Sequence, residues 1–454
     1  DSCLQKGPDP ELGVYLARFA LYPDPNIPNP GLTCQWRRML GSYTWSDQTK
    51  FQSSLGISDG VFHDDFASLS LSRDGLILVT GTATAPILGT GGVGPGCPED
   101  EVLAPNGKSD VYLGLHTLAT GQCKAQYLVS GAGNSEQYGL AIAAGRTWTP
   151  MDEKQRDEFW TLAHVVGGMT LPGCDVKTPN SLVLAKMYES GALYCEKTLT
   201  LPMDPGTQVS PFGLRVRFDG NGLVDRGWLG INFTGKIDGV ASTGGDDALM
   251  YVLSGSMAKA KPPLRIYGDG AQFVHTVYVG PGELLIGGRA EKSININNNI
   301  LVLDNWVGHQ PFWAVLDHDL LHLKEPAFST AQGSGAGAVR GGFSSFNEVY
   351  KHMYLGFQVN DSINLGGGEY TVADDSWDMF VGRLNPVQPK HVWSEGVGAG
   401  PNNSAGHQTL QYLLPVGEGL FVMIGTYQVA LGVTTPPLEG HPSHDRGFIA
   451  LAGG

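Results

Sequence analysis

A short apolar phrase recurs seven times along the chain at nearly even intervals, and this repeat constrains the fold more than any other feature. Each copy surrounds a central residue that is Ala or Gly in six cases and Tyr in one. The seven central residues are Ala17, Gly114, Ala185, Tyr251, Ala314, Gly382 and Ala450. After a first interval of 97 residues, the spacings are 71, 66, 63, 68 and 68. Such a period indicates one repeated supersecondary unit, each copy too small to bury its own apolar face.

The unit after each phrase has the pattern of three further strands. A second strand follows, as in Cys123–Leu128, and then a hairpin, as in Ser68–Leu71 and Leu76–Gly81 around Asp74-Gly75. Asp-Gly between apolar runs favours a tight turn because Gly adopts positive φ without strain. Four-stranded units repeated radially make an all-β β-propeller, which leaves only short, protected edges. A β-solenoid is the alternative, but its coils are usually shorter than these units.

The chain is predicted to form one propeller domain over residues 1–454. Six complete hairpins and seven phrases, with a phrase near each terminus, predict six blades and a ring closed by both termini; a hairpin hidden within Ala20–Gly60 would make seven. The small central residue of the phrase fits either a strand near the crowded axis or a tight contact between sheets. Long loop insertions are expected near 20–60, 85–108 and 329–346, and the polar segment Pro150–Glu158 is expected to be an exposed excursion.

Composition excludes some classes of protein. The net charge of −15 disfavours nucleic-acid binding, which needs clustered Lys and Arg. No apolar run reaches the roughly 18–20 residues needed to span a bilayer. The sequence begins Asp1-Ser2-Cys3 without Met, from which we expect that an export signal peptide has been removed.

Six cysteines follow a positional rule in the first three repeats. In each repeat one Cys precedes the phrase and the other lies on the strand after it, which predicts the disulfides Cys3–Cys34, Cys97–Cys123 and Cys174–Cys195 among 15 connectivities. Three such bonds imply an oxidising compartment: secreted, periplasmic or cell-surface. Cys-x-x-Cys is absent, so the usual zinc and haem spacings are missing.

Several polar clusters are candidate ion sites. Asp219, Asn221 and Asp225 resemble a calcium loop but lack its terminal Glu, so a polar turn is the competing interpretation. The mixed imidazole and carboxylate segments His63–Asp65, Asp317–His322 and His441–Asp445 are alternatives, although such residues are ordinary in surface turns. We therefore expect no cofactor, and Ca²⁺ is the one candidate that the sequence offers.

The unit resembles the SBBP-type bacterial β-propeller repeat. Asp378–Leu384 is similar to that family's opening strand, Tyr138–Ile142 to its Gly-rich third element and Leu78–Gly81 to its last strand. The leading Asp is kept at 110, 247 and 378 but replaced in the other four copies. The resemblance implies an exported or cell-surface bacterial propeller of binding or structural type, and it carries over no catalytic residue.

Catalytic motifs are missing from the sequence: there is no Gly-x-Ser-x-Gly, phosphate loop or His-Glu-x-x-His. We therefore expect a non-enzymatic module that binds a protein or glycan partner through its loops, or that forms part of an extracellular assembly. The alternative is a polysaccharide-acting enzyme that uses carboxylates around the axis. An enzyme should gather two or more acids of perturbed pKa in one axial pocket, whereas a binding module should present a broad exposed apolar or aromatic patch.

Overall fold

A computed structural model shows a chain built from β-strands, and the described residues contain no helix. Accordingly, none of them belongs to a helix long and apolar enough to cross a membrane. The structure describes residues 13–22, 31–42, 69–71, 75–83, 86–89, 91–98, 101–131, 135–148, 155–189, 191–218, 224–279, 283–296, 298–302, 310–319, 323–330, 339–347, 352–359, 362–365, 367–368, 370–372, 377–385, 390–397, 408–417, 420–428, 430–431, 438–439 and 446–453.

Six antiparallel sheets follow one another along the described chain, each a meander of successive strands. Sheet 1 contains β3 (Leu69–Leu71), β4 (Leu76–Ala83), β7 (Asp110–Thr117) and β8 (Cys123–Val129). Sheet 2 contains β9 (Glu136–Trp148), β10 (Gln155–Val166), β13 (Asn180–Glu189) and β14 (Leu193–Pro202). Sheet 3 contains β15 (Gln208–Phe218), β16 (Val224–Thr234), β19 (Asp247–Ser254) and β20 (Leu264–Tyr267). Sheets 4 to 6 are β21 (Gln272–Val279), β22 (Glu283–Ala290), β25 (Gln310–Asp317) and β26 (Leu323–Thr330); β27 (Val339–Asn347), β28 (His352–Val359), β31 (Asp378–Asn385) and β32 (Lys390–Val397); and β33 (Gln408–Gly417), β34 (Leu420–Tyr427) and β37 (Arg446–Gly453).

A short hairpin is inserted between the second and third strands of every one of these sheets, a feature that the sequence pattern did not predict. The six hairpins are β5 (Ile87–Leu88) with β6 (Val102–Leu103), β11 (Met169–Leu171) with β12 (Cys174–Val176), β17 (Lys236–Ile237) with β18 (Val240–Ala241), β23 (Ser293–Ile296) with β24 (Asn299–Val302), β29 (Ser362–Ile363) with β30 (Tyr370–Thr371), and β35 (Ala430–Leu431) with β36 (Leu438–Glu439). Sheets 1 to 5 therefore contain the expected four-stranded meander, sheet 6 contains three described strands of it, and the short hairpin is an addition to the expected unit.

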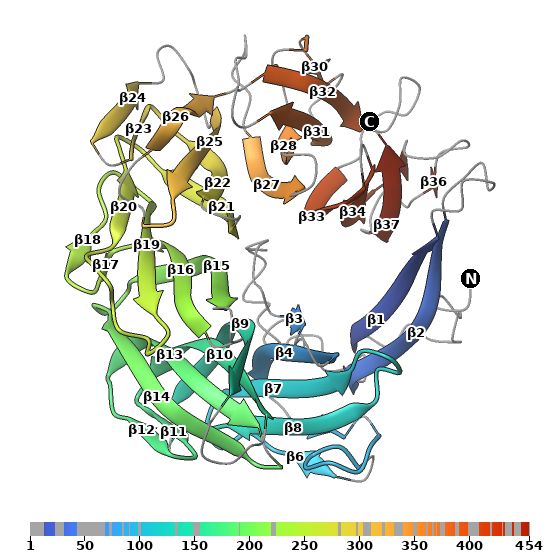
Figure 1. The fold of residues 1–454 in the computed structure, drawn as a ribbon, viewed down its shortest axis with the longest axis vertical. Coiled ribbons are helices and arrows are strands. Elements are labelled where there is room, and N and C mark those ends of the chain that lie inside the picture. The colour runs from blue at the N-terminus through green and yellow to red at the C-terminus, as the bar shows by residue number, and fades with distance from the viewer. Residues whose placement is uncertain are drawn as a thin grey trace.

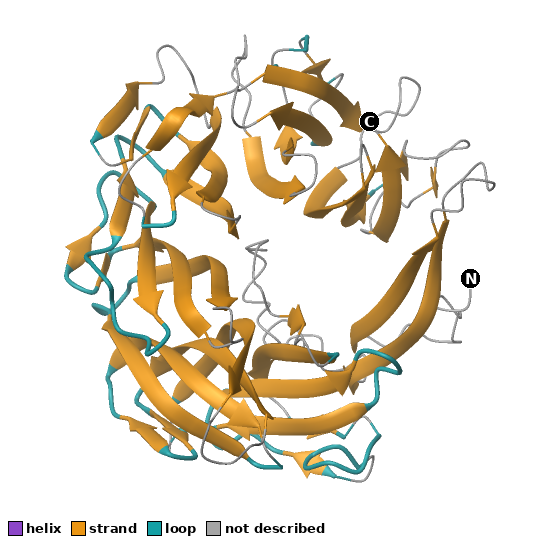
Figure 2. Cartoon of the chain, in the orientation of Figure 1, coloured by secondary structure: helices purple, strands orange, loops and turns teal. Residues whose placement is uncertain are grey.

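The sheets stand around a common centre, as the blades of a propeller do (Figure 1), and many of the described loops lie at the periphery (Figure 2). The first strands of consecutive sheets contact one another, which places β9, β15, β21, β27 and β33 nearest the centre. β1 (Gly13–Tyr22) pairs with β2 (Gly31–Ser42) as a separate two-stranded sheet, whose Leu16 and Trp36 pack on sheet 1. β2 also approaches β37. The number of blades and the closure of the ring stay predictions.

The recurring phrase is the third strand of each sheet, and its continuous apolar character follows from burial on both faces. In β19, Met250 packs into the core shared with sheet 4, whereas Leu249 and Tyr251 pack into the core shared with sheet 2. The central residues Ala185 and Ala314 are fully buried between sheets. Of the two interpretations of the small central residue, contact between sheets is the one that holds, because the first strands and not the third strands lie at the centre.

The leading Asp of the phrase closes the loop that precedes it. Asp110 accepts a hydrogen bond from the amide of Asn106 at 2.8 Å, and Asp247 accepts one from the amide of Thr243 at 3.1 Å. Both contacts span four residues and give one oxygen of each buried carboxylate, Oδ2, a local backbone donor. Asp110 and Asp247 thus each cap the amide of a loop residue.

Three expected irregular segments contain strands. The predicted insertion at 329–346 is wrong in part, because Val339–Asn347 forms β27 and β26 runs to Thr330. The 85–108 segment carries β5 and β6, and the 20–60 segment carries β2, with 43–60 outside the described residues. The polar excursion at 150–158 is also wrong at its end: β10 begins at Gln155, and Glu158 is only 1% exposed. Inter-sheet packing overrides the local polarity there.

Candidate functional site

The outermost strand of sheet 1, β8, provides the floor of the candidate site. β8 pairs with β7 on one side, with Leu113 opposite Tyr127 and Val111 opposite Val129. Alternate residues of a strand direct both their N–H and their C=O groups toward the same neighbour. The other side of β8 is therefore a row of backbone groups that must be covered or left open to a partner.

A glycine-rich segment covers the first part of this edge. The amide of Gln126 donates to the carbonyl oxygen of Pro95 at 2.8 Å, and the predicted Cys97–Cys123 disulfide is present and fastens the segment to β8. A Cβ atom on Gly94 would lie 1.7 Å from the carbonyl oxygen of Lys124. The backbone can approach so closely only because that position is glycine.

The β11–β12 hairpin of sheet 2 covers the last part of the edge. The amide of Thr170 donates to the carbonyl oxygen of Ser130 at 2.9 Å. The hairpin is also fastened to its own sheet, because the amide of Cys195 donates to the carbonyl oxygen of Pro172 and the predicted Cys174–Cys195 disulfide is present. The third predicted bond, Cys3–Cys34, involves Cys3, which lies outside the described residues.

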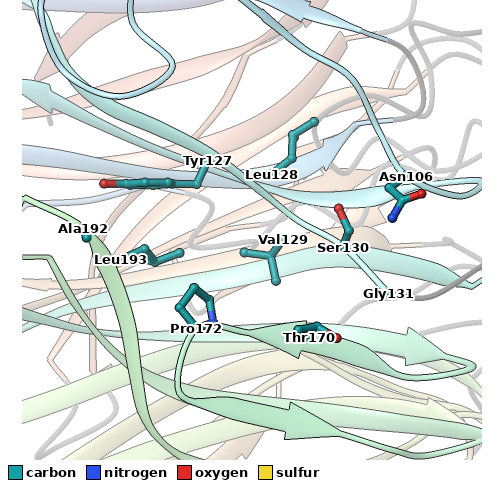
Figure 3. A pocket seen from close by; sticks show the side chains of 10 residues that line it. All are labelled: Asn106, Tyr127, Leu128, Val129, Ser130, Gly131, Thr170, Pro172, Ala192 and Leu193. Atoms are coloured by element: carbon teal, nitrogen blue, oxygen red, sulfur yellow. The ribbon is translucent and has the colours of Figure 1, made fainter.

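Along β8 and beside the β11–β12 hairpin lies a cavity of about 800 Å³, which we call the edge groove (Figure 3). Tyr127, Leu128 and Val129 of β8 lie along one side, and Thr170 and Pro172 of the hairpin lie along the other. The full lining is Asn106, Tyr127, Leu128, Val129, Ser130, Gly131, Thr170, Pro172, Ala192 and Leu193. The middle of the groove is apolar, while Asn106, Ser130 and Thr170 stand toward one end and the Tyr127 hydroxyl toward the other (Figure 3).

The polar end of the groove is held in place by a buried carboxylate. The Ser130 hydroxyl donates to Asp110 Oδ2 at 2.5 Å, and the same oxygen accepts the amide of Asn106. At the other end of the groove, burial, with a smaller contribution from the charge of Glu189, raises the pKa of Tyr127 to about 12, so its phenol stays protonated at neutral pH. Its Oη has no hydrogen-bond partner among the described residues. The groove thus combines fixed polar groups with apolar walls, as small-ligand and peptide sites do.

A second polar cluster lies between sheets 2 and 3. Lys186 Nζ stands 3.5 Å from Glu158 Oε1 and 3.0 Å from Glu196 Oε2. Burial raises the pKa of Glu158, against the opposing effects of Lys186 and of the Trp160 indole N–H, which donates at 2.9 Å. Burial also acts to raise the pKa of Glu196, but hydrogen bonds from Tyr188 and Lys186 outweigh it and leave that pKa lowered.

Asp247 is the other carboxylate whose pKa is raised in the described part of the chain. Its burial outweighs the hydrogen bonds from Arg265 and Thr243. Glu158 and Asp247 belong to β10 and β19 of different sheets, and each faces its own cation. Both therefore act as members of structural ion pairs, and together they do not form a pair of acids in one described pocket.

The candidate calcium loop is described only at its end. Asp219 and Asn221 lie outside the described residues, whereas Asp225 stands in β16. Both Asp225 carboxylate oxygens accept hydrogen bonds from Arg217, at 3.1 and 2.6 Å. This contact, with a smaller opposing effect of burial, lowers the pKa of Asp225. Its charge is thus already balanced by an arginine.

The other candidate ion segments are only partly described. Asp319 forms an ion pair with Arg226, and the ring of His318 lies against Trp228 with centroids 5.3 Å apart. His322 and the segments His63–Asp65 and His441–Asp445 lie outside the described residues. Among the described residues, no group of three His, Cys, Asp or Glu side chains is placed to hold a metal.

Comparison with known proteins gives no family for this chain. No protein-family model matches it, and no curated protein matches it. Among solved structures, the chain is similar to the polysaccharide lyase Uly1, with 10% identity, a TM-score of 0.36, and coverage of 86% of this chain and 90% of that one. It is also similar to the WD40 domain of SCAP from fission yeast, with 8% identity, a TM-score of 0.29, and coverage of 86% and 84%. At this level neither match identifies a function.

Proposed function

We propose that this protein is a non-enzymatic β-propeller that binds a protein or glycan partner through the edge groove. The observation that supports this is a cavity of about 800 Å³ at a sheet edge, with both covering segments fastened by disulfides. A preformed groove spares a ligand the entropy of ordering its site. The 85–108 segment, expected from the sequence to engage a partner, contributes Asn106 to the lining.

A polysaccharide-acting enzyme is the competing function, and it requires two carboxylates placed about 5–10 Å apart on either side of a sugar bond. Within the described residues, the acids of raised pKa are Glu158 and Asp247, on separate sheets and each beside a cation. Their surroundings explain their pKa values as parts of structural ion pairs. The acids thus give less support to catalysis than the groove gives to binding.

We further propose an oxidising location for the protein, either secreted, periplasmic or on a cell surface, where it could serve as part of an extracellular assembly. The two disulfides support this, because such bonds persist outside reducing compartments. Membership of the SBBP-type repeat family is also part of this proposal. Its support is the resemblance of the short motifs in the repeat unit.

The test uses one variant that fills the groove and one matched variant outside it. Ala192→Trp places an indole on an exposed lining residue, and Val93→Trp places one on an exposed residue that does not line the cavity. Both proteins and the wild type are applied to a glycan array and to a display library of random peptides. We expect a ligand that binds wild type and Val93→Trp alike and binds Ala192→Trp at least tenfold more weakly.

Two outcomes would overturn the proposal. One is that every ligand found binds Ala192→Trp as tightly as it binds the wild type. The other is glycan cleavage by the purified protein that a single carboxylate substitution, such as Glu158→Gln, abolishes.

A further inference from the structure

One rung of the β8 edge is open, and it faces the edge groove. The amide of Gln126 and the carbonyl of Ser130 are both engaged on this edge, by Pro95 and Thr170 respectively. Leu128 lies midway between them, so by alternation its N–H and C=O point to the same edge. Among the described residues neither group has a partner there, and Leu128 lines the cavity.

A proline explains why the hairpin leaves this rung unpaired. Antiparallel continuation of the Thr170–Ser130 contact would bring Pro172 opposite Leu128, and Figure 3 shows Pro172 across the groove from β8. Proline has no N–H to donate to the Leu128 carbonyl. The Pro172 carbonyl is likewise committed, because it accepts the amide of Cys195. The hairpin therefore turns toward β14 and leaves a gap beside β8.

The same position is filled by an extended strand elsewhere in this chain. In sheet 3 the outermost strand β20 is paired by β23, which the next sheet supplies, with Ile266 opposite Ile296 and Tyr267 opposite Asn295. At the end of β14 the β17–β18 hairpin of sheet 3 makes a shorter version of this contact, through a bridge between Met203 and Ile237. The outer edges of these sheets thus take an added strand from a neighbour.

We propose that the edge groove binds a polypeptide segment, one residue of which pairs with Leu128 at the outer edge of β8. This inference rests on the proposed function and chooses between its two ligand classes. One residue of the segment would supply a C=O and an N–H to Leu128, and so fill the open position between the rungs that Pro95 makes with Gln126 and Thr170 makes with Ser130. Alternate side chains of the segment would enter the cavity and point to solvent.

The chemistry of the walls favours a peptide over a glycan. Val129 and Leu193 are buried apolar residues, and they stand with Pro172 around the open rung. A glycan presents rows of hydroxyl groups and would need polar side chains along this length. An extended peptide can place an apolar side chain in the cavity, and its backbone can supply a donor and an acceptor to the open edge of β8. We therefore expect the bound segment to carry an apolar residue at its central inward position.

The test begins from the tightest peptide that the display library yields and uses it as the probe. Its residues are N-methylated one at a time, and affinity is measured against the wild type by calorimetry. N-methylation of the residue that pairs with Leu128 should weaken binding roughly tenfold, the scale of one lost hydrogen bond, while methylation of its neighbours has less than a twofold effect.

An amide-to-ester replacement at Leu128 tests the other side of the pair. It removes an N–H that the fold leaves unpaired, so we expect unchanged thermal melting and roughly tenfold weaker peptide binding. The matched ester at Tyr127 removes an N–H that pairs with Leu113, and it should lower the melting temperature. This pair of variants separates loss of binding from loss of fold.

The outcomes are distinct for the two proposals. Peptide binding that is unchanged by the Leu128 ester, with no single peptide residue sensitive to N-methylation, overturns the pairing with Leu128. Binding of glycans alone, blocked by Ala192→Trp, also overturns it but leaves the groove as the functional site. If no peptide or glycan binding is sensitive to Ala192→Trp, both proposals fail.

Discussion

Removal of the Cys174–Cys195 disulfide should destabilise the protein by an amount set mainly by the loop that it closes. The two cysteines are 21 residues apart. In the chain-entropy model, a loop of this length restricts the unfolded chain by about 3 kcal/mol. The double variant Cys174→Ala with Cys195→Ala should therefore lose about that much free energy of unfolding.

The folded state should survive this change. Met169, Leu171 and Val176 of the hairpin are buried, and the amides of Thr170 and Cys195 keep their backbone acceptors. These contacts hold the hairpin against sheets 1 and 2 without the covalent bond. The loss should thus come from the greater freedom of the unfolded chain, with the folded structure little altered.

Denaturant unfolding of the oxidised wild type and of the variant measures the difference. The Cys97→Ala with Cys123→Ala variant is the matched control, because its loop of 26 residues predicts a loss within about 0.5 kcal/mol of the first. Two losses that differ by several kcal/mol would show that local packing decides the effect. No loss in either variant would refute the entropic reasoning altogether.

Three further predictions follow from single contacts. Gly227→Val should destabilise the fold by roughly 1–3 kcal/mol in denaturant unfolding, because a Cβ there would lie 2.4 Å from the fully buried Trp160 ring. Burial raises the pKa of Glu158 in the folded protein, so ionisation of its carboxyl destabilises the fold as the pH rises above about 4.5, the pKa in the unfolded chain. Glu158→Gln should therefore increase the free energy of unfolding at pH 7 and change it little at pH 4. Equal effects at the two pH values would contradict this. Deletion of residues 1–19 removes Leu16 from the face of sheet 1 and should lower the temperature of one cooperative unfolding transition, whereas unchanged melting would argue against closure of the ring.

The strands were largely predictable from the sequence because their pattern arises from burial on both faces. Apolar runs such as Leu182–Met187 and turn signals such as Asp74-Gly75 both depend on local residues alone. The positional rule for cysteines correctly predicted Cys97–Cys123 and Cys174–Cys195. It needed only the positions of the two cysteines relative to the recurring phrase, and these are the same in each repeat. In each case the same local sequence pattern occurs in several repeats, and this recurrence distinguishes it from a chance match.

The short hairpins and the buried acid were not predictable in the same way. β11 and β12 have three residues each, too few to show a period, and only Pro172-Gly173 between two short apolar stretches indicated a turn. Glu158 lies in a polar run that indicated exposure. In the structure it forms an ion pair with Lys186 of the adjacent strand and accepts a hydrogen bond from Trp160 of its own strand. Those partners depend on register between strands, which no single segment encodes.

The groove combines a repeated feature with a local departure from it. Hairpins meet the outer edge of the preceding sheet at β20 and at the end of β14, so covering that edge is a recurring role of the inserted hairpin. At β8 the hairpin carries Pro172, which cannot complete the rung, and the Cys174–Cys195 disulfide fastens it to β14 instead. A disulfide that only stabilised the fold could join any two adjacent strands. Here the two disulfides fasten the segments that contact Gln126 and Ser130, on either side of Leu128, whose outward N–H and C=O have no partner among the described residues.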